Sequence, residues 1–222
     1  MKLLFLALAF FRFAEPAPAP LDVPLGATLH AAADNPAPAA SVDHKLYEYT
    51  PDEAVSISVR TELAHWFEQH LLEDAETKAT LRTHLMDTDL VALLAPEVEK
   101  YGYPANSVAS AVTLWFAVNY GIVHDVEVSD AAIRALYRQI TALFATLPDF
   151  ERGTDAEKQR MAEGLYWAAA LQRHAYEQAK AGMPGYHLDA IAEESRRIMQ
   201  RYGIDLDALQ LTDEGVVRKG SK

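Results

Sequence analysis

An amide in an apolar helical segment is the first side chain of this sequence with suitable chemistry for a ligand site. Asn119 shares a helix face with Val112 and Trp115, because offsets of three and four residues return to the same side of a helix. A buried amide without hydrogen-bond partners costs about 1–3 kcal/mol. Asn119 is therefore either a core amide that bonds to a neighbouring helix, or a ligand-facing amide in a pocket beside Trp115.

A second candidate stripe lies in a later helical segment. Glu163, Trp167 and His174 follow one another at offsets of four and seven residues, so they share a helix face. A carboxylate and an imidazole that flank an indole have the chemistry to line a groove. At a rise of about 1.5 Å per residue, Glu163 and His174 lie about 16 Å apart along the helix axis and cannot act on each other. A half-exposed amphipathic margin would give the same pattern.

These residues support two hypotheses of different classes. The first is a binding or interaction protein for an unknown small molecule or protein partner, with a helical groove walled by Trp115, Asn119, Glu163 and Trp167. The second is a hydrolase-like enzyme that pairs a carboxylate such as Glu163 with a histidine from another helix, within about 3 Å. The sequence alone identifies neither the ligand nor a reaction.

The pattern of ligating residues predicts no metal site and no cofactor. The histidines considered as ligands are scattered, and no two of them have the i, i+4 spacing that puts two ligands on one helix face: His65, His70, His84, His124, His174 and His187. The sequence has no cysteine, which excludes thiolate ligands, a cysteine nucleophile and disulfides. It also has no Gly-rich phosphate loop and no G-x-S-x-G element.

The charge of the chain argues against nucleic acid as a partner. The formal net charge is -12, whereas nucleic acids and anionic membranes are bound by basic surfaces. The acidity is concentrated in residues 43–101, where 13 acids against 5 bases give a net charge of -8. Residues 151–222 hold 12 acids and 11 bases, a net charge of -1. A cationic partner for the first half is one interpretation, and a solvated acidic surface is the simpler one.

The N-terminal residues have the features of a signal peptide over residues 1–14. Lys2 precedes a nine-residue apolar run, which is shorter than the roughly 18–20 residues of a membrane span. The candidate cleavage sites are Ala17-Pro18-Ala19 and Ala31-Ala32-Ala33. We expect export to the periplasm or secretion, with no membrane insertion after the signal is removed.

The rest of the chain divides into a linker and a domain. Residues 15–41 are rich in proline and alanine, a composition typical of extended spacers, so we expect a disordered linker there. Residues 42–222 form the expected helical domain, which is the size of one domain with a single core.

Helix start signals and an apolar 3.6-residue rhythm recur along this domain. Thr50-Pro51-Asp52-Glu53 and Thr154-Asp155-Ala156-Glu157 match capping boxes, and Asn106 and Ser129 match N-caps. Alternating strand patterns are absent. The sequence therefore predicts an all-α fold, a single bundle of six or seven helices.

The segment "NSVASAVTLWFAVNYGIV", at residues 106–123, predicts the centre of this bundle. It is too short for a comfortable membrane span. Ser110, Thr113, Ala117 and Tyr120 form a narrow small and polar stripe on an otherwise apolar helix. Such a helix is packed by neighbours on most sides, so we expect residues of about 107–122 to be the central apolar helix.

Several stretches together resemble an uncharacterised family of exported bacterial all-helical proteins, a domain of unknown function. They are "YTPDEAVSISVRTELAHWF", "YGYPANSVASAVTLWFAVNYG", "EKQRMAEGLYWAAALQRHAYEQAKAG" and "GIDLDALQLTDEGVV". The resemblance covers roughly Tyr47 to Val217, and its most distinctive residues are Ala162, Glu163, Gly164, Leu165, Tyr166, Leu211, Thr212 and Gly215. It implies export and a helical fold, and no activity, ligand or catalytic residue.

Overall fold

The computed structural model describes residues 25–34, 44–70, 75–147 and 152–220, so the expected signal peptide over residues 1–14 lies outside the described residues. The α-helices of the described part are Leu25–Asp34 (α2), Glu53–His70 (α3), Ala75–Asp87 (α4), Leu90–Glu99 (α5), Val108–His124 (α6), Asp130–Phe144 (α7), Asp155–Lys180 (α9) and Leu188–Arg201 (α10). Seven of these lie within residues 42–222, which confirms the all-α fold and the expected six or seven helices.

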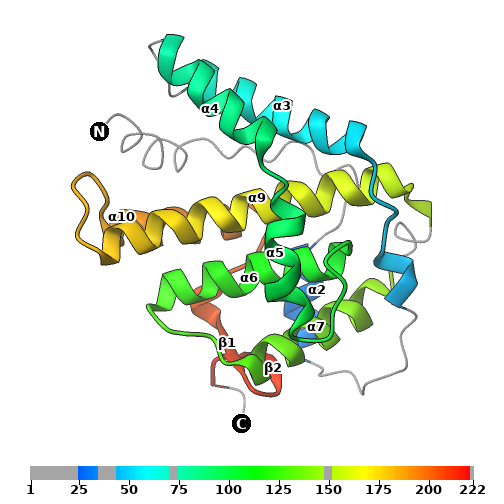
Figure 1. The fold of residues 1–222 in the computed structure, drawn as a ribbon. Helices are drawn as coiled ribbons and strands as arrows, with labels where there is room; N and C mark the ends of the chain where they lie inside the picture. Colours follow the sequence, from blue (N-terminus) through cyan, green and yellow to red (C-terminus); the bar gives the residue numbers. More distant parts are fainter. Residues whose placement is uncertain (1–24, 35–43, 71–74, 148–151, 221–222) are drawn as a thin grey trace.

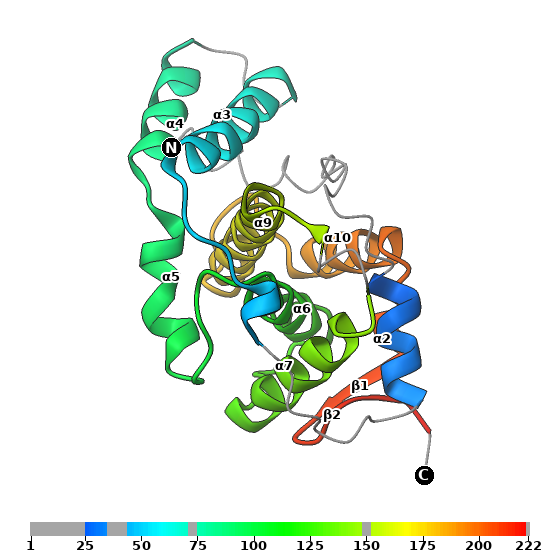
Figure 2. The same cartoon turned by 90° about the vertical axis from the view of Figure 1, so that its right-hand side faces the viewer.

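Two helices, α6 and α9, form the centre of the bundle. Figure 2 looks nearly along α9, with α3 above it, α5 to the left, α6 below and α10 to the right. The most extensive packing between two elements is that of α6 against α9. Both helices carry fully buried alanines, whose small side chains let neighbouring helices approach closely: Ala109, Ala111, Ala162 and Ala169.

The burial of α6 confirms its predicted role as the central helix. All of its residues are buried except Leu114, Val118 and His124. The helix packs against α7 and α10 as well as α9, which explains why it is apolar on nearly every side. Among the described residues, no helix is long and apolar enough to cross a membrane.

The first two helices of the domain form a projecting pair above α9. Figure 1 shows α3 and α4 side by side at one end of the molecule, with α5 leading back to the body of the bundle. The pair has its own buried cluster, formed by Val59, Ala64, Phe67, Leu81 and Leu85. Trp167 of α9 completes this cluster, so one indole connects the pair to the centre.

The expected linker over residues 15–41 contains a helix that the sequence did not predict. Residues Leu25–Asp34 form α2, and Leu29 and Ala33 of this helix are buried in the main core. Gly26 permits the close approach of α2 to the chain after α10, because a Cβ atom there would lie 2.4 Å from the Gly203 carbonyl carbon. The disordered-linker prediction therefore does not hold for these ten residues.

A small sheet is a second departure from the predicted helical domain. Strands Leu209–Thr212 (β1) and Gly215–Arg218 (β2) form an antiparallel hairpin. Gln139 of α7 binds this hairpin through both ends of its amide, because its Oε1 accepts from Val216 N at 2.6 Å and its Nε2 donates to Val216 O at 3.1 Å. Four-residue strands are too short to show an alternating pattern, which is why the sequence did not reveal them.

The helix starts were predicted with mixed success. The side chains of Ser129 and Thr154 accept from backbone N–H groups of α7 and α9, and Glu157 completes the capping box of α9. The start of α3 lies later than predicted, because Asp52 Oδ1 accepts from Ala54 N at 2.8 Å and the helix begins at Glu53. Asn106 is not an N-cap: Ser107 holds that position, and Asn106 Nδ2 donates to Tyr49 O at 2.7 Å.

We expect the packing of α6 against α9 to be intolerant of added volume. Ala162→Leu inserts three carbons at a fully buried position and should lower the free energy of unfolding by about 1–3 kcal/mol. Gly164→Ala is the matched change two residues later, where a Cβ atom meets no other atom within 4 Å. It should raise the free energy of unfolding by about 0.5–1 kcal/mol, because glycine weakens a helix interior.

Urea unfolding followed by far-ultraviolet circular dichroism measures both changes. Equal effects of the two variants on the unfolding midpoint would contradict the assignment of Ala162 to a tight helix contact.

Candidate functional site

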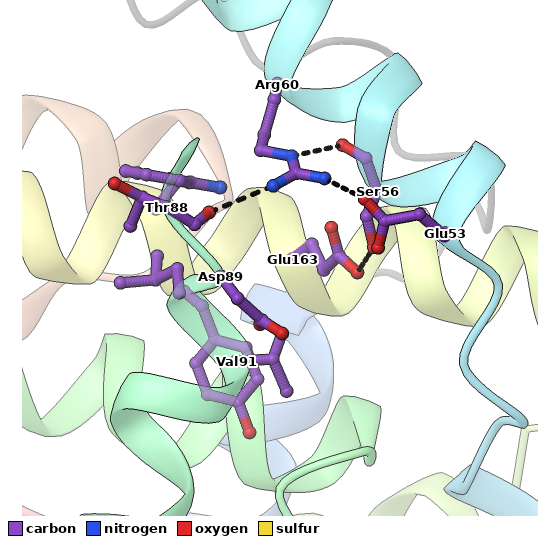
Figure 3. A pocket seen from close by; sticks show the side chains of 10 residues that line it. Glu53, Ser56, Arg60, Thr88, Asp89, Val91 and Glu163 are labelled. Carbon is purple, nitrogen blue, oxygen red and sulfur yellow. Dashed lines mark hydrogen bonds and ion pairs between the residues drawn. The ribbon is translucent and has the colours of Figure 1, made fainter. Parts of the chain in front are cut away.

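A small pocket opens where α3, α5 and α9 meet, between the projecting helix pair and the centre of the bundle. Figure 3 shows the side chains around it, with Glu163 in the middle of the labelled residues. The pocket is lined by Glu53, Ser56, Arg60, Thr88, Asp89, Leu90, Val91, Glu163, Tyr166 and Trp167. The centre of a water-sized molecule can occupy about 20 Å³ of this pocket. The pocket therefore has room for about one water or one small terminal group.

Glu163 is the buried acidic residue of this pocket, with 5% of its surface exposed. Its Oε1 accepts from the Ser56 hydroxyl at 2.6 Å and from the Gln159 amide at 2.8 Å (Figure 3 draws the first of these). Its second oxygen, Oε2, has no hydrogen bond or ion pair with any residue that the structure describes. One oxygen of a fixed carboxylate thus remains available to an occupant of the pocket.

The position of Glu163 follows from the spacing of three residues on α9. Gln159, Glu163 and Trp167 are separated by four residues each, so all three side chains lie on the face of α9 that meets α3. Gln159 bonds to both the backbone N–H and the carbonyl of Asp52, at 2.8 and 2.9 Å. The start of α3 is therefore fixed to α9 by polar contacts, and Trp167 supplies the apolar contact further along.

Arg60 holds the pocket together from the other side. Its guanidinium donates to the carbonyl oxygens of Met86 at 2.9 Å and Thr88 at 3.2 Å, and it forms an ion pair with Glu53. Its Nε also donates to the carbonyl of Ser56 at 3.3 Å. These bonds connect α3 to the segment between α4 and α5, and they commit the cation of the pocket to partners within the protein.

A further carboxylate of the lining is that of Asp89, whereas Tyr49 lies outside the lining. Asp89 is the N-cap of α5, where its Oδ1 accepts from Ala92 N at 2.9 Å. The hydroxyl of Tyr49 is buried and has no hydrogen-bond partner among the described residues. Burial raises the pKa of Tyr49 well above its ordinary value, and the charges of Glu163 and Asp89 raise it further, so this hydroxyl stays protonated.

The structure brings together only two of the four residues that the sequence predicts for a groove. Glu163 and Trp167 both line the pocket, whereas Trp115 and Asn119 do not. Trp115 is buried against Tyr202, with ring centroids 4.9 Å apart. Asn119 is a core amide, which donates to the Trp115 carbonyl at 2.8 Å and exchanges two hydrogen bonds with Gln172 at 3.0 and 2.9 Å.

The described residues do not provide the histidine that the enzyme hypothesis requires. No histidine lines the pocket, and His65 and His174 lie on exposed surfaces. The basic side chain of the lining is Arg60, whose guanidinium is already bonded to Glu53 and to backbone carbonyls. Within the same described ranges, no cluster of three or more acidic or histidine side chains is arranged to hold a metal ion.

Sequence reasoning missed most of the pocket's polar residues. Ser56, Arg60 and Asp89 belong to segments that were assigned only to helix faces and helix starts. One signal was available for Gln159, because it precedes Glu163 by one helical turn and an amide there is positioned to orient the carboxylate. No feature of the sequence indicates that α3 and α5 meet beside this face of α9.

Comparisons with known proteins identify one family. A family model described as a family of unknown function (DUF6683) matches residues 27–219. The match includes most of α2, every element that lines the pocket and the terminal hairpin. Comparisons with curated proteins and with solved structures gave no match.

The assignment of Asn119 to the core predicts a specific pattern of stability. Asn119→Leu leaves the buried amide of Gln172 without its partner and should lower the free energy of unfolding by about 1–3 kcal/mol. Adding Gln172→Leu removes the orphaned amide, so the double variant should recover part of this loss. A double-mutant cycle from urea unfolding measures the coupling, and strictly additive effects would contradict a structural amide pair.

Proposed function

This chain belongs to that family of unknown function, and we propose that it is a binding protein that holds a terminal group of a partner molecule between α3, α5 and α9. The single observation that carries the proposal is Glu163. Its side chain is only 5% exposed, one of its carboxylate oxygens is fixed by Ser56 and Gln159, and the other has no described partner. A buried carboxylate is costly to maintain, and the unused oxygen offers a directional contact to a ligand.

The size of the pocket indicates how much of a bound molecule it can enclose. Sites that enclose a whole small molecule usually measure about 300–1,000 Å³, whereas this pocket leaves about 20 Å³ for a water-sized group. An occupant therefore inserts one small end and keeps its remaining atoms outside. This favours an interaction protein over an enzyme that encloses its substrate.

The chemistry of the lining supports binding more than hydrolysis. The hydrolase hypothesis pairs Glu163 with a histidine from another helix, and the described lining offers no histidine for that role. Ser56 donates its proton to Glu163 while it accepts from Gln159, so its hydroxyl is engaged on both sides. We therefore propose binding and assign no reaction.

We also propose that the protein works outside the cytoplasm, in the periplasm or as a secreted protein. The support is the N-terminal sequence, in which Lys2 and an apolar run precede the Pro/Ala-rich segment. The acidic surface of the first half and the net charge of -12 support a partner other than nucleic acid.

A plugged pocket tests the binding function. Val91 is half-buried and lines the pocket, so Val91→Phe should fill the space without removing a polar group. Leu93→Phe is the matched control on the same helix, because Leu93 is 66% exposed and does not line the pocket. The measurement is a screen of small polar fragments against the full chain, read from the indole N–H resonance of Trp167 and assigned with Trp167→Phe.

Fragments that shift the Trp167 resonance should bind Val91→Phe at least about tenfold more weakly and Leu93→Phe with unchanged affinity. Equal binding to the two variants, with melting temperatures close to that of the unmodified chain, would place the binding elsewhere. A screen in which no fragment shifts the Trp167 resonance would overturn the proposed function.

A further inference from the structure

We propose that the pocket between α3, α5 and α9 takes a primary ammonium group at the end of an alkyl chain, an inference that rests on the binding function proposed above. The group can come from a free diamine or from a lysine side chain. Both sources share one recognition chemistry, which is a compact cation with three N–H donors. The inference follows from the charge, the oxygen groups and the size of the described pocket.

The net negative charge of the pocket lining favours a positively charged ligand over a neutral or anionic one. Three acidic side chains, Glu53, Asp89 and Glu163, and one basic side chain, Arg60, give a formal charge of -2. Arg60 is already bonded to Glu53 and to three carbonyl oxygens, so it cannot offset the charge of Glu163 or receive an anion. No ion pair within the described ranges involves Glu163. A bound cation would be the counter-charge that this buried carboxylate lacks.

The oxygen groups around the pocket match the donors of an ammonium group. Glu163 Oε2 has no described partner, and Asp89 uses only Oδ1 to cap α5. An unpartnered carboxylate oxygen of a buried side chain costs free energy unless a bound molecule satisfies it. An ammonium group donates to both of these carboxylates and accepts from neither.

The apolar part of the lining suits the chain that carries the ammonium. Leu90, Val91 and Trp167 line the same pocket and offer carbon surface to methylene groups. The indole of Trp167 also attracts cations held over its ring face. An ammonium group is close to a water molecule in size and so suits a pocket with room for about one water, whereas a guanidinium group is larger and planar.

Three four-carbon probes test the charge requirement: butylammonium, butanol and butyrate. Butylammonium should shift the Trp167 indole resonance of the full chain and bind at least about tenfold more tightly than the neutral and anionic probes. Glu163→Gln keeps the shape and the bonds to Ser56 and Gln159 but removes the charge, so it should weaken butylammonium binding by about tenfold or more. Glu127→Gln removes the same charge from an exposed loop residue outside the lining and should have no effect.

The outcomes separate this inference from the proposed function. If butanol or butyrate binds as well as butylammonium and the Val91→Phe plug still blocks binding, the pocket is a binding site and the ammonium inference is wrong. If no probe and no fragment shifts Trp167, both are wrong. If Glu163→Gln binds butylammonium as tightly as Glu127→Gln does, the recognition does not depend on the carboxylate and the inference is also wrong.

A further pair of probes distinguishes the sources of the ammonium group. 1,4-Diaminobutane represents a free diamine, and a short peptide with one central lysine represents a protein partner. Tighter binding of the diamine assigns the site to small amines, and tighter binding of the peptide assigns it to a lysine side chain. A peptide with arginine in place of the lysine should bind at least about tenfold more weakly, because the guanidinium is larger and planar and suits a pocket with room for about one water less well. Equal binding of the arginine peptide would contradict the inference.

Discussion

The close packing of α6 on α9 is the constraint on which the rest of the structure depends. These two helices make the most extensive contact in the bundle, and the amide pair of Asn119 and Gln172 fixes their rotation about each other. The hydroxyl of Tyr166 adds a further contact, because it donates a hydrogen bond at 2.8 Å to the carbonyl of Ala105, just before α6. Helix α9 thus meets α6 on one side, and it meets α3 on the neighbouring side, which carries Gln159, Glu163 and Trp167.

The contact between α3 and α9 is unusually polar for a helix packed on a core. Gln159, Ser56 and Glu163 form a chain of hydrogen bonds, and the buried Arg60 ties α3 to the segment before α5. Apolar residues of similar volume in such positions often give equal or greater stability. The charged side chains at this contact are the feature on which the proposed ligand recognition rests.

The sequence was sufficient for the helical architecture and for part of the site. Apolar periodicity identified α6 as the central helix and placed Glu163 and Trp167 on one face, and both line the pocket. Periodicity does not say which neighbour a face meets, so Trp115 and Asn119 were assigned to the same groove although they lie in the core. Arg60 was missed for a related reason. Its guanidinium bonds to the backbone carbonyls of Met86 and Thr88, and any residue type provides a backbone carbonyl, so the sequence does not indicate these contacts.

The errors at the ends of the domain have a different physical origin. Local composition suggested a spacer before residue 42, but tertiary contacts of Leu29 stabilise a helix there. The terminal hairpin depends on Gln139 of α7, a contact that no local pattern reveals. In both places a short segment is stabilised by contacts with residues distant in the chain. Patterns among neighbouring residues in the sequence do not indicate such contacts.

The position of α2 also limits how the chain can mature. A peptidase that cut after Ala33 would remove Leu29 from the main core and the Gly26 backbone from its contact with Gly203. A cut before Leu25 would keep all ten residues of α2. Of the two small-residue sequences near the N-terminus, only Ala17-Pro18-Ala19 therefore permits processing without the loss of a packed helix.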